Sequence, residues 1–353
     1  LLLSASEARG AFNELSGEAH ASVKSGLIAS DRLTRDATND RLRSASGAVA
    51  AKPVPVSNYW DNGRWSHDPM KAVMPNATPP VFSLWGQTSG SWSSIDAQDG
   101  IAGTNISTGG LVTGFDTLVV PDTRIGAFLG YSRTSIDVDG RSSSADSDNY
   151  SLGIYGGTKW GGLSLRSGAS YTNHQITSER SVDFPGLSQD LEADYSARSL
   201  QVYGELGYEF RTEFATFEPF ANLAHVNLKT DGFREAGGSA ALNADGDTTN
   251  TTFTTLGLRA SSDFAIGGLP TLATGLFGWR HAFGDTDPAS RLSFAGSDSY
   301  TIRGAPVSQD AFVVQLGMDF TLSQTTTFGI SYNGEFGDDG IGNGVDAKLQ
   351  VRF

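Results

Sequence analysis

The chain of 353 residues contains no cysteine. This absence excludes a disulfide-linked scaffold and any metal site built from thiolate ligands. Basic residues are scarce as well, with 25 lysines and arginines against 39 aspartates and glutamates, which gives a net charge of −14. Because binding to nucleic-acid phosphates requires clustered basic side chains, no nucleic-acid partner is expected.

Long hydrophobic runs are also missing. The mean hydropathy is slightly negative, and the chain has no apolar run of about 18 residues, the minimum for a membrane-spanning helix. A spanning β-strand needs only about 9–11 residues with apolar side chains at alternate positions. The sequence therefore predicts no transmembrane helix but leaves a membrane β-barrel open.

Signatures of catalysis are poor. The five histidines show no metal-ligand spacing, and no G-x-S-x-G motif occurs. Asp146 and Asp148 resemble half of a calcium-binding loop but lack the distal glutamate, so an acidic loop is the favoured interpretation. We predict no enzymatic activity, no cofactor and no metal for this chain.

The C-terminal segment alternates strictly between apolar and polar residues. The apolar positions are Val345, Ala347, Leu349, Val351 and Phe353. Because side chains alternate across a strand, this segment has one apolar and one charged face. In a soluble sandwich the apolar face would point inward, whereas in an outer-membrane barrel it would face lipid.

Similar segments recur through most of the chain. Strands are predicted near 81–93, 105–119, 124–138, 149–160, 163–180, 191–210, 216–229, 250–265, 271–283, 309–322, 325–336 and 343–353. Connections after the even strands are short, such as 161–162 and 266–270, whereas most of those after the odd strands are long and polar, such as 139–148, 230–249 and 284–308. Loops sorted in this way are typical of an outer-membrane barrel. We therefore predict an all-β membrane fold, a twelve-stranded antiparallel transmembrane β-barrel.

The face predicted to point inward carries charges of both signs. The predicted charged residues of the lumen wall are Arg166, Glu205, Glu218, Arg259, Arg280, Asp319 and Glu335. Such charges would be costly in a dry core but not in a water-filled lumen. Aromatic residues that could form girdles at the membrane interfaces are Trp85, Tyr131, Trp160, Tyr171 and Trp279.

A helix is predicted over 16–43, with Ser16 as its N-cap. Its apolar stripe is thin, and its later part carries Arg32, Arg35, Asp36, Asp40, Arg41 and Arg43. A surface helix or coiled-coil stalk would explain this pattern. A helix threaded through a polar pore would explain this pattern too, because a thin apolar stripe and many charges are tolerated there. Twelve strands enclose more space than their side chains fill, so a helix could occupy the lumen.

If the helix occupies the pore, its charges are expected to pair with the wall. Arg32, Arg35, Arg41 and Arg43 would face the wall acids Glu205, Glu218, Asp319 and Glu335. Asp31, Asp36 and Asp40 would face Arg166, Arg259 and Arg280. The alternative is that each charge is simply solvated, since exposed ion pairs contribute only about 0–1 kcal/mol.

Short motifs in a constant order give the chain a family resemblance. They are L-S-G-E-A-H at 15–20, R-x-x-R-D at 32–36, D-R-L-R at 40–43, L-W-G-Q at 84–87, L-G-I-Y-G-G at 152–157, G-E-L-G-Y at 204–208, E-P-F-A-N-L-A at 218–224, L-G-L-R at 256–259, G-W-R-H-A-F-G at 278–284 and the terminal aromatic. Together they resemble the C-terminal translocator domain of classical monomeric autotransporters, the proteins of type V secretion.

The resemblance implies an α-helix in the pore of the barrel and an export function. Residues 1–44 would be the passenger-proximal linker and pore helix, 45–80 a connecting linker, and 81–353 the barrel. A passenger preceding Leu1 would be carried to the surface of a Gram-negative bacterium and anchored in its outer membrane. The apolar positions of the last strand would be the signal read by the outer-membrane assembly machinery. Lipid and lipopolysaccharide would surround a monomer.

One feature departs from the family pattern. Some relatives cut themselves in the pore at an Asn-Asn junction, whereas this chain has only Asn13-Glu14 and Asn39-Asp40. An uncut form, or cleavage by another protease, is therefore expected. The alternative functions are an outer-membrane porin and the membrane anchor of a surface hydrolase with its active site in the passenger. A soluble lectin-like sandwich is the most distant alternative.

Overall fold

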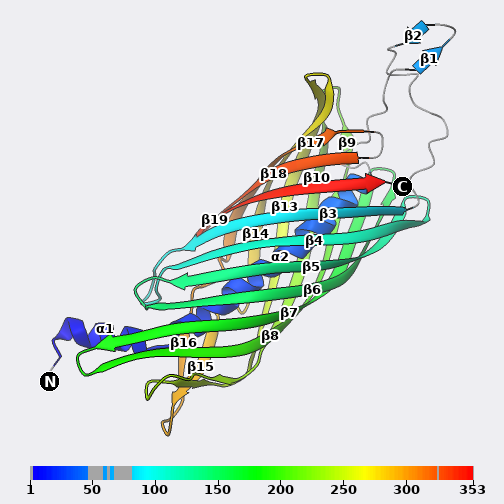
Figure 1. Ribbon diagram of the computed structural model, residues 1–353. Coiled ribbons are helices and arrows are strands. Elements are labelled where there is room, and N and C mark those ends of the chain that lie inside the picture. The colour runs from blue at the N-terminus through cyan, green and yellow to red at the C-terminus, as the bar shows by residue number, and fades with distance from the viewer. Residues whose placement is uncertain (1–2, 47–58, 62–63, 67–81, 324–325, 353) are drawn as a thin grey trace.

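The computed structural model describes residues 3–46, 59–61, 64–66, 82–323 and 326–352. Two helices, α1 (Ala5–Leu15) and α2 (Glu18–Ala45), precede a large barrel (Figure 1). The predicted linker at 45–80 lies mostly outside the described residues. Its described part includes the short antiparallel pair β1 (Tyr59–Asp61) and β2 (Arg64–Ser66).

Twelve long strands form the barrel wall. They are β3 (Phe82–Ile95), β4 (Thr104–Val120), β5 (Thr123–Val138), β6 (Ser143–Trp160), β7 (Leu163–Phe184), β8 (Leu187–Tyr208), β10 (Thr216–Thr230), β13 (Asp247–Ile266), β14 (Leu269–Gly284), β17 (Asp310–Thr321), β18 (Thr326–Gly337) and β19 (Gly340–Arg352). Neighbours pair antiparallel, and β19 pairs with β3, so the sheet closes on itself. The short β9 (Phe210–Arg211) adds to the end of β10. The predicted fold class is confirmed, and a soluble sandwich is excluded.

The two ends of the barrel differ in their connections. At one end, the short-turn end, strands are joined by tight turns at 121–122, 161–162 and 267–268. The other, the long-loop end, has the loops 231–246 and 285–309. The first barrel strand begins, and the last one ends, at the short-turn end (Figure 1).

The predicted loop at 139–148 is largely wrong, because β6 already begins at Ser143. Asp146 and Asp148 lie on this strand, where they accept hydrogen bonds from Ser135 and Tyr131 of β5. Polar residues on the outer face suggested a loop. They mark instead a strand that extends beyond the apolar part of the wall.

A second, smaller sheet crosses the long-loop end. It is built from β11 (Phe233–Arg234), β12 (Leu242–Ala244), β15 (Ala289–Phe294) and β16 (Tyr300–Arg303), in this order. These strands come from the connections after β10 and β14, which the sequence analysis predicted as long polar loops. We call this element the lid sheet.

Helix α1 lies outside the lumen. Ser4 caps its first turn, accepting a hydrogen bond from the Glu7 amide, while Glu7 accepts one from the Ser4 amide, the reciprocal pattern of a capping box. At its other end, Arg180 of β7 donates to the Glu14 carbonyl at 2.7 Å, and the Asp183 amide donates to the Glu14 side chain at 2.7 Å. The helix is thereby held on the part of β7 that projects beyond the barrel.

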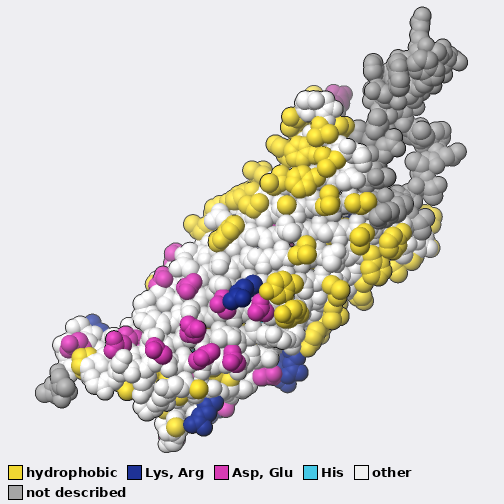
Figure 2. All heavy atoms as spheres, in the orientation of Figure 1, with side chains coloured by type: hydrophobic (Ala, Val, Ile, Leu, Met, Phe, Trp, Pro, Cys, Tyr) yellow, Lys and Arg dark blue, Asp and Glu magenta, His cyan; other side chains and the backbone are white. Residues whose placement is uncertain are grey.

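The outer face of the wall carries an apolar band. On β6 it runs from Trp160 through Ile154, which is 66% exposed, to Tyr150. At a tilt of about 40° this stretch is about 25 Å high, the height of the lipid-facing band of outer-membrane barrels. Figure 2 shows hydrophobic side chains gathered toward the short-turn half and acidic ones over the long-loop half.

Four of the five predicted girdle aromatics are exposed on the outer face: Tyr131, Trp160, Tyr171 and Trp279. The fifth prediction, Trp85, is wrong. Its side chain is only 5% exposed and donates a hydrogen bond to the Tyr155 hydroxyl inside the barrel at 2.6 Å. On β3 the outward positions are those of Phe82 and Leu84, and strict alternation turns Trp85 inward.

We expect an arginine in the apolar band to destabilise the folded barrel. Ile154→Arg should lower the free energy of unfolding by about 2–4 kcal/mol, because the charge must leave water for hydrocarbon. Gln175→Arg places the same side chain on the outer face above the band and should change it by less than about 0.5 kcal/mol. Urea titrations in lipid vesicles measure both values. Equal effects would contradict a lipid-facing band.

Candidate functional site: the helix inside the barrel

Helix α2 runs through the lumen from the long-loop end to the short-turn end (Figure 1). At its start, Glu18 accepts a hydrogen bond from the Ala102 amide in the loop after β3 at 2.6 Å. Near its end, the Ser44 hydroxyl donates to Gln350 of β19 at 3.4 Å. Most of the helix is buried, including Glu18, Lys24, Arg41 and Arg43. The exception is one face with Ala29, Arg32, Leu33 and Asp36, which borders a cavity inside the barrel. The interpretation as a surface helix or stalk is therefore wrong for residues 18–45.

The predicted N-cap is also wrong. Ser16 ends α1, with its hydroxyl donating to the Asn13 carbonyl, and α2 follows Gly17. Gly17 has a φ of +68°, and a Cβ there would lie 2.5 Å from Leu242 and 2.7 Å from Leu292 of the lid sheet. Only glycine combines this left-handed turn with so close a contact. The chain thus bends sharply between the outer and inner helices.

Apolar contacts fix one side of α2 against the wall. Val23 and Leu27 pack with Ile106, Ile136 and Ile176 of β4, β5 and β7. Near the short-turn end, Ala37 and Leu42 pack in a second cluster, whose wall members are Trp85, Val112, Phe128 and Tyr155. The thin apolar stripe of the sequence therefore faces the β4–β7 side of the lumen.

A buried ion cluster holds the helix near the short-turn end. Arg41 donates to both carboxylate oxygens of Asp116 on β4, at 2.5 and 2.8 Å. Asp116 also accepts hydrogen bonds from Arg124 and from the Tyr155 hydroxyl, the latter at 2.8 Å. All three partners of Asp116 are charged or polar donors, so the carboxylate is fully compensated despite complete burial.

At mid-height the helix bonds to two sides of the wall. Arg32 pairs with Glu335 of β18, as predicted for a helix arginine and a wall acid. Arg35 instead donates to the neutral Gln201 of β8 at 3.3 Å. Asp31 accepts a hydrogen bond from the Ser199 hydroxyl at 2.8 Å.

Most wall charges pair with one another. Arg166 lies directly across from Glu205 in the β7–β8 ladder, and Glu218 directly across from Arg259 in the β10–β13 ladder. All four groups join in one network with distances of 2.7–3.0 Å. Arg43 approaches this network from the helix, with 3.6 Å between its guanidinium and Glu205.

The predicted pairing of helix acids with wall arginines is wrong. Asp36 pairs with Arg32 and Arg35 of its own helix, and Asp40 pairs with Arg43. Two further pairs lie within the wall. Arg280 of β14 binds Glu335 of β18, and Asp319 of β17 binds Lys348 of β19 at 2.9 Å. The helix pairs lie within one turn of each other, and each wall pair lies on strands separated by a single strand, so these charges are within reach without a contact between helix and wall.

The start of α2 is clamped by the lid sheet and the loops around it. His20 Nε2 lies 2.7 Å from Glu235, which also binds Arg180. Burial raises the pKa of the Glu235 carboxyl, but the hydrogen bonds from His20 and Arg180 outweigh it and lower the pKa to about 2. Lys24 pairs with Asp247, and Glu18 binds Arg141 at 2.7 Å.

Backbone contact completes the clamp. A Cβ on Gly304, which follows β16, would lie 2.2 Å from the Ser22 amide nitrogen, so the loop chain touches the helix backbone itself. Here the Ser22 hydroxyl accepts a hydrogen bond from the Ala305 amide at 3.0 Å. The partners of the helix in this clamp, such as Glu235, Arg141 and Ala305, were not predicted from the sequence, because loop residues lack a period that could place them.

The predicted assembly-signal residues lie on β19, between β18 and β3. Val345 and Leu349 are exposed on the outer face, and Ala347 and Val351 are half-buried. Phe353 lies outside the described residues. Their role in assembly stays a prediction. Within the described part of the chain, no three histidine or acidic side chains are grouped to hold a metal, and no helix is long and apolar enough to cross a membrane.

Comparison with known proteins places this arrangement in context. The family model described as autotransporter β-domain matches residues 84–333. Two extracellular serine proteases of Serratia marcescens are 34% and 33% identical over 351 and 350 residues. The alignments cover 99% of this chain but 31% of each relative, so the chain spans about a third of their length.

Solved structures support the same fold. The translocator domain of the autotransporter NalP from Neisseria meningitidis has a TM-score of 0.64 at 18% identity, covering 80% of this chain and 92% of that one. The β-domain of the Bordetella autotransporter BrkA has a TM-score of 0.59 at 19% identity, covering 77% and 100%. At these identities the likeness shows the fold alone.

We expect the Arg41–Asp116 pair to be a main anchor of the helix. Arg41→Met should lower the free energy of unfolding by about 3–5 kcal/mol, because it leaves a buried carboxylate short of a partner. Arg198→Met is the control: Arg198 pairs with Asp231 on the surface, where loss of the pair should cost less than about 1 kcal/mol. Urea unfolding gives both values, and equal effects would contradict the anchor.

Proposed function

This chain belongs to the autotransporter β-domain family, and from that premise we propose how it exports its passenger. Domains of this family are outer-membrane translocators of Gram-negative bacteria, which is the function and location of this chain. We propose that the passenger lies N-terminal to α1, that it has left the barrel at the long-loop end, and that α2 is the segment that stays behind in the pore.

The direction of α2 carries this proposal. The helix begins under the lid sheet at the long-loop end and ends beside the short turns. In outer-membrane barrels the long loops are extracellular and the short turns periplasmic. Any polypeptide joined to the start of α1 is therefore already on the outer side, while α2 itself runs through the lumen to the short-turn end, where β3 begins. A diffusion porin is disfavoured because a buried, multiply bonded helix occupies its channel.

The passenger is proposed to be an extracellular hydrolase of the serine-protease type. The relatives at 34% and 33% identity are named extracellular serine proteases, and the matched part is only 31% of each. The active site would then lie in the passenger, and the translocating chain itself would have no catalytic role. Asn39 and Asp40 lie buried in α2, and with no Asn-Asn junction we propose that the chain is not cut there by itself.

Assembly in the membrane is proposed to depend on β19 and the outer band. Before β19 pairs with β3, the outward side chains of Val345, Ala347, Leu349 and Val351 would present an apolar strand to the barrel assembly machinery, with Phe353 as the last residue of the segment. Lipid would surround the apolar band and lipopolysaccharide the acidic half above it. The twelve-stranded wall closes without a second copy, which supports a monomer.

We expect an epitope placed before α1 to reach the surface of intact cells. The test uses the chain with a signal peptide and this epitope, probed with added protease. An epitope inserted at Gly296, in the loop between β15 and β16, should be equally accessible. One inserted at Gly161, in a short turn, should be protected. A protected N-terminal epitope on a folded, membrane-inserted barrel would contradict the proposed direction.

A further inference from the structure

One short segment at the long-loop end contacts the backbone of α2 itself. Residues 304–306 follow β16 and precede β17, and we call them the latch. All three residues are buried, and the Gly304 amide donates a hydrogen bond to the Pro288 carbonyl at 2.9 Å. The latch is therefore a fixed part of the structure that surrounds the start of the helix.

Two serines of the helix bind both polar backbone groups of Ala305. The Ser22 hydroxyl accepts a hydrogen bond from the Ala305 amide at 3.0 Å, and the Ser25 hydroxyl donates one to the Ala305 carbonyl at 2.5 Å. Residues three apart lie on the same face of a helix, so the two hydroxyls reach one residue of the latch. Because Ala305 is fully buried, its amide and carbonyl would be left unsatisfied without these partners.

Small residues on both sides allow this close approach. A Cβ at Gly304 would lie 2.2 Å from the Ser22 amide nitrogen and 2.8 Å from the Ala21 Cβ. Ala21 and Ser22 are themselves completely buried. Since buried surfaces are closely packed, a larger side chain at either position would push the latch away and break its hydrogen bonds.

The pair of hydroxyls occurs at one place in α2. Ser22 and Ser25 are the only serine or threonine residues spaced three apart within residues 18–45. A displacement of the helix by one turn would bring Gly26 and Ala29, or Glu18 and Ala21, to the latch. Neither pair has a hydroxyl group, so any such displacement loses both hydrogen bonds.

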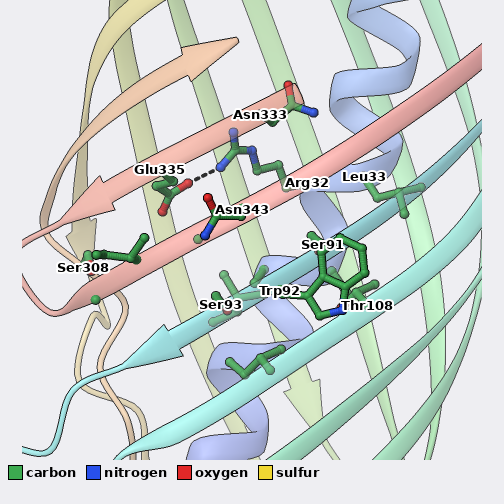
Figure 3. A pocket seen from close by; sticks show the side chains of 18 of the residues that line it. Arg32, Leu33, Ser91, Trp92, Ser93, Thr108, Ser308, Asn333, Glu335 and Asn343 are labelled. Carbon is green, nitrogen blue, oxygen red and sulfur yellow. Dashed lines mark hydrogen bonds and ion pairs between the residues drawn. The ribbon is translucent and has the colours of Figure 1, made fainter. Parts of the chain in front are cut away.

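Long side chains define the height of the helix less sharply. On the flank near β3 and β19 a cavity of about 200 Å³ borders the helix, and Arg32 reaches from the helix to Glu335 (Figure 3). By changing rotamers, an arginine can follow its partner over much of the rise of one helical turn, about 5.4 Å. A serine hydroxyl that is bonded to backbone has no such reach, because it lies one bond beyond Cβ.

We propose that the latch determines where the exported chain comes to rest. It recognises the small, hydroxyl-bearing face formed by Ala21, Ser22 and Ser25 and holds α2 in its seated register. This inference rests on the proposed function, in which the chain moves outward through the lumen. Segments with larger side chains cannot bring the two backbones this close, so they pass the latch without being held. Ser22, Ser25 and Gly304 are thus positioning residues for the last step of export.

The test measures the register of α2 in intact outer membranes by oxidative cross-linking to Gly130→Cys of β5. Thr34→Cys reports the seated register, because a Cβ at Gly130 would lie 3.5 Å from the Thr34 methyl. Thr38→Cys reports a helix that has moved outward by one turn. Every variant carries an epitope before α1, which is probed with added protease.

Removing the latch bonds should let the helix come to rest further out. Ser22→Ala combined with Ser25→Ala should raise the yield of the Thr38→Cys cross-link at least about fivefold. Gly304→Val changes the other partner and should have the same effect. Ser30→Ala is the matched control, because this buried hydroxyl donates to the Leu27 carbonyl of its own helix at 2.7 Å, and it should leave the yield unchanged.

The outcomes separate the latch from the proposed function. If neither latch variant raises the Thr38→Cys cross-link, the register is set elsewhere and the latch proposal is wrong, although the direction of export stands. An equal rise with Ser30→Ala would also contradict the latch. If the Thr34→Cys cross-link does not form with the latch intact, or if the epitope is protected, the proposed function itself is wrong.

Discussion

Twelve strands enclose a lumen that their own side chains cannot fill, and the rest of this structure depends on how that space is used. The strands satisfy their backbone hydrogen bonds by closing on each other, with β19 paired to β3, as a lipid environment requires. The lumen is then occupied by α2. Its small residues, such as Ala37, fit against the wall on one side, and its long arginines reach the wall elsewhere.

Most charged side chains of the barrel wall are neutralised by other wall residues, and the helix contributes only a few further ion pairs. Arg166, Glu205, Glu218 and Arg259 compensate one another across adjacent strands, and Arg43 only approaches this network. The firm attachments are at the two ends, Arg41 to Asp116 below and the lid-sheet clamp above. The helix is thus held at both ends and packs closely against β4–β7, whereas cavities remain between its other side and the wall.

The fold could be predicted from the sequence because alternation marks each strand, and the unusual inward charges on β7, β8 and β10 indicate a wet interior. The register also makes the Arg166–Glu205 pair predictable once the turn at 185–186, which joins β7 and β8, is known. Apart from the pairing of a helix arginine, Arg32, with the wall acid Glu335, the helix contacts could not be predicted, since no sequence pattern sets the rotation of α2 against the wall. Asp116 was missed although it occupies an inward position, and the lid sheet was missed because its strands are too short for a period.

The most direct measurement of the central claim is a disulfide between the helix and the wall in intact outer membranes. The chain has no native cysteine, and a Cβ at Gly130 of β5 would lie 3.5 Å from the Thr34 methyl of α2. This places a Thr34→Cys and Gly130→Cys pair within bonding reach. Oxidation should join this pair, whereas Thr34→Cys with Leu129→Cys, whose side chain points outward, should stay reduced. A helix that joins neither site, or both equally, would contradict its place in the pore.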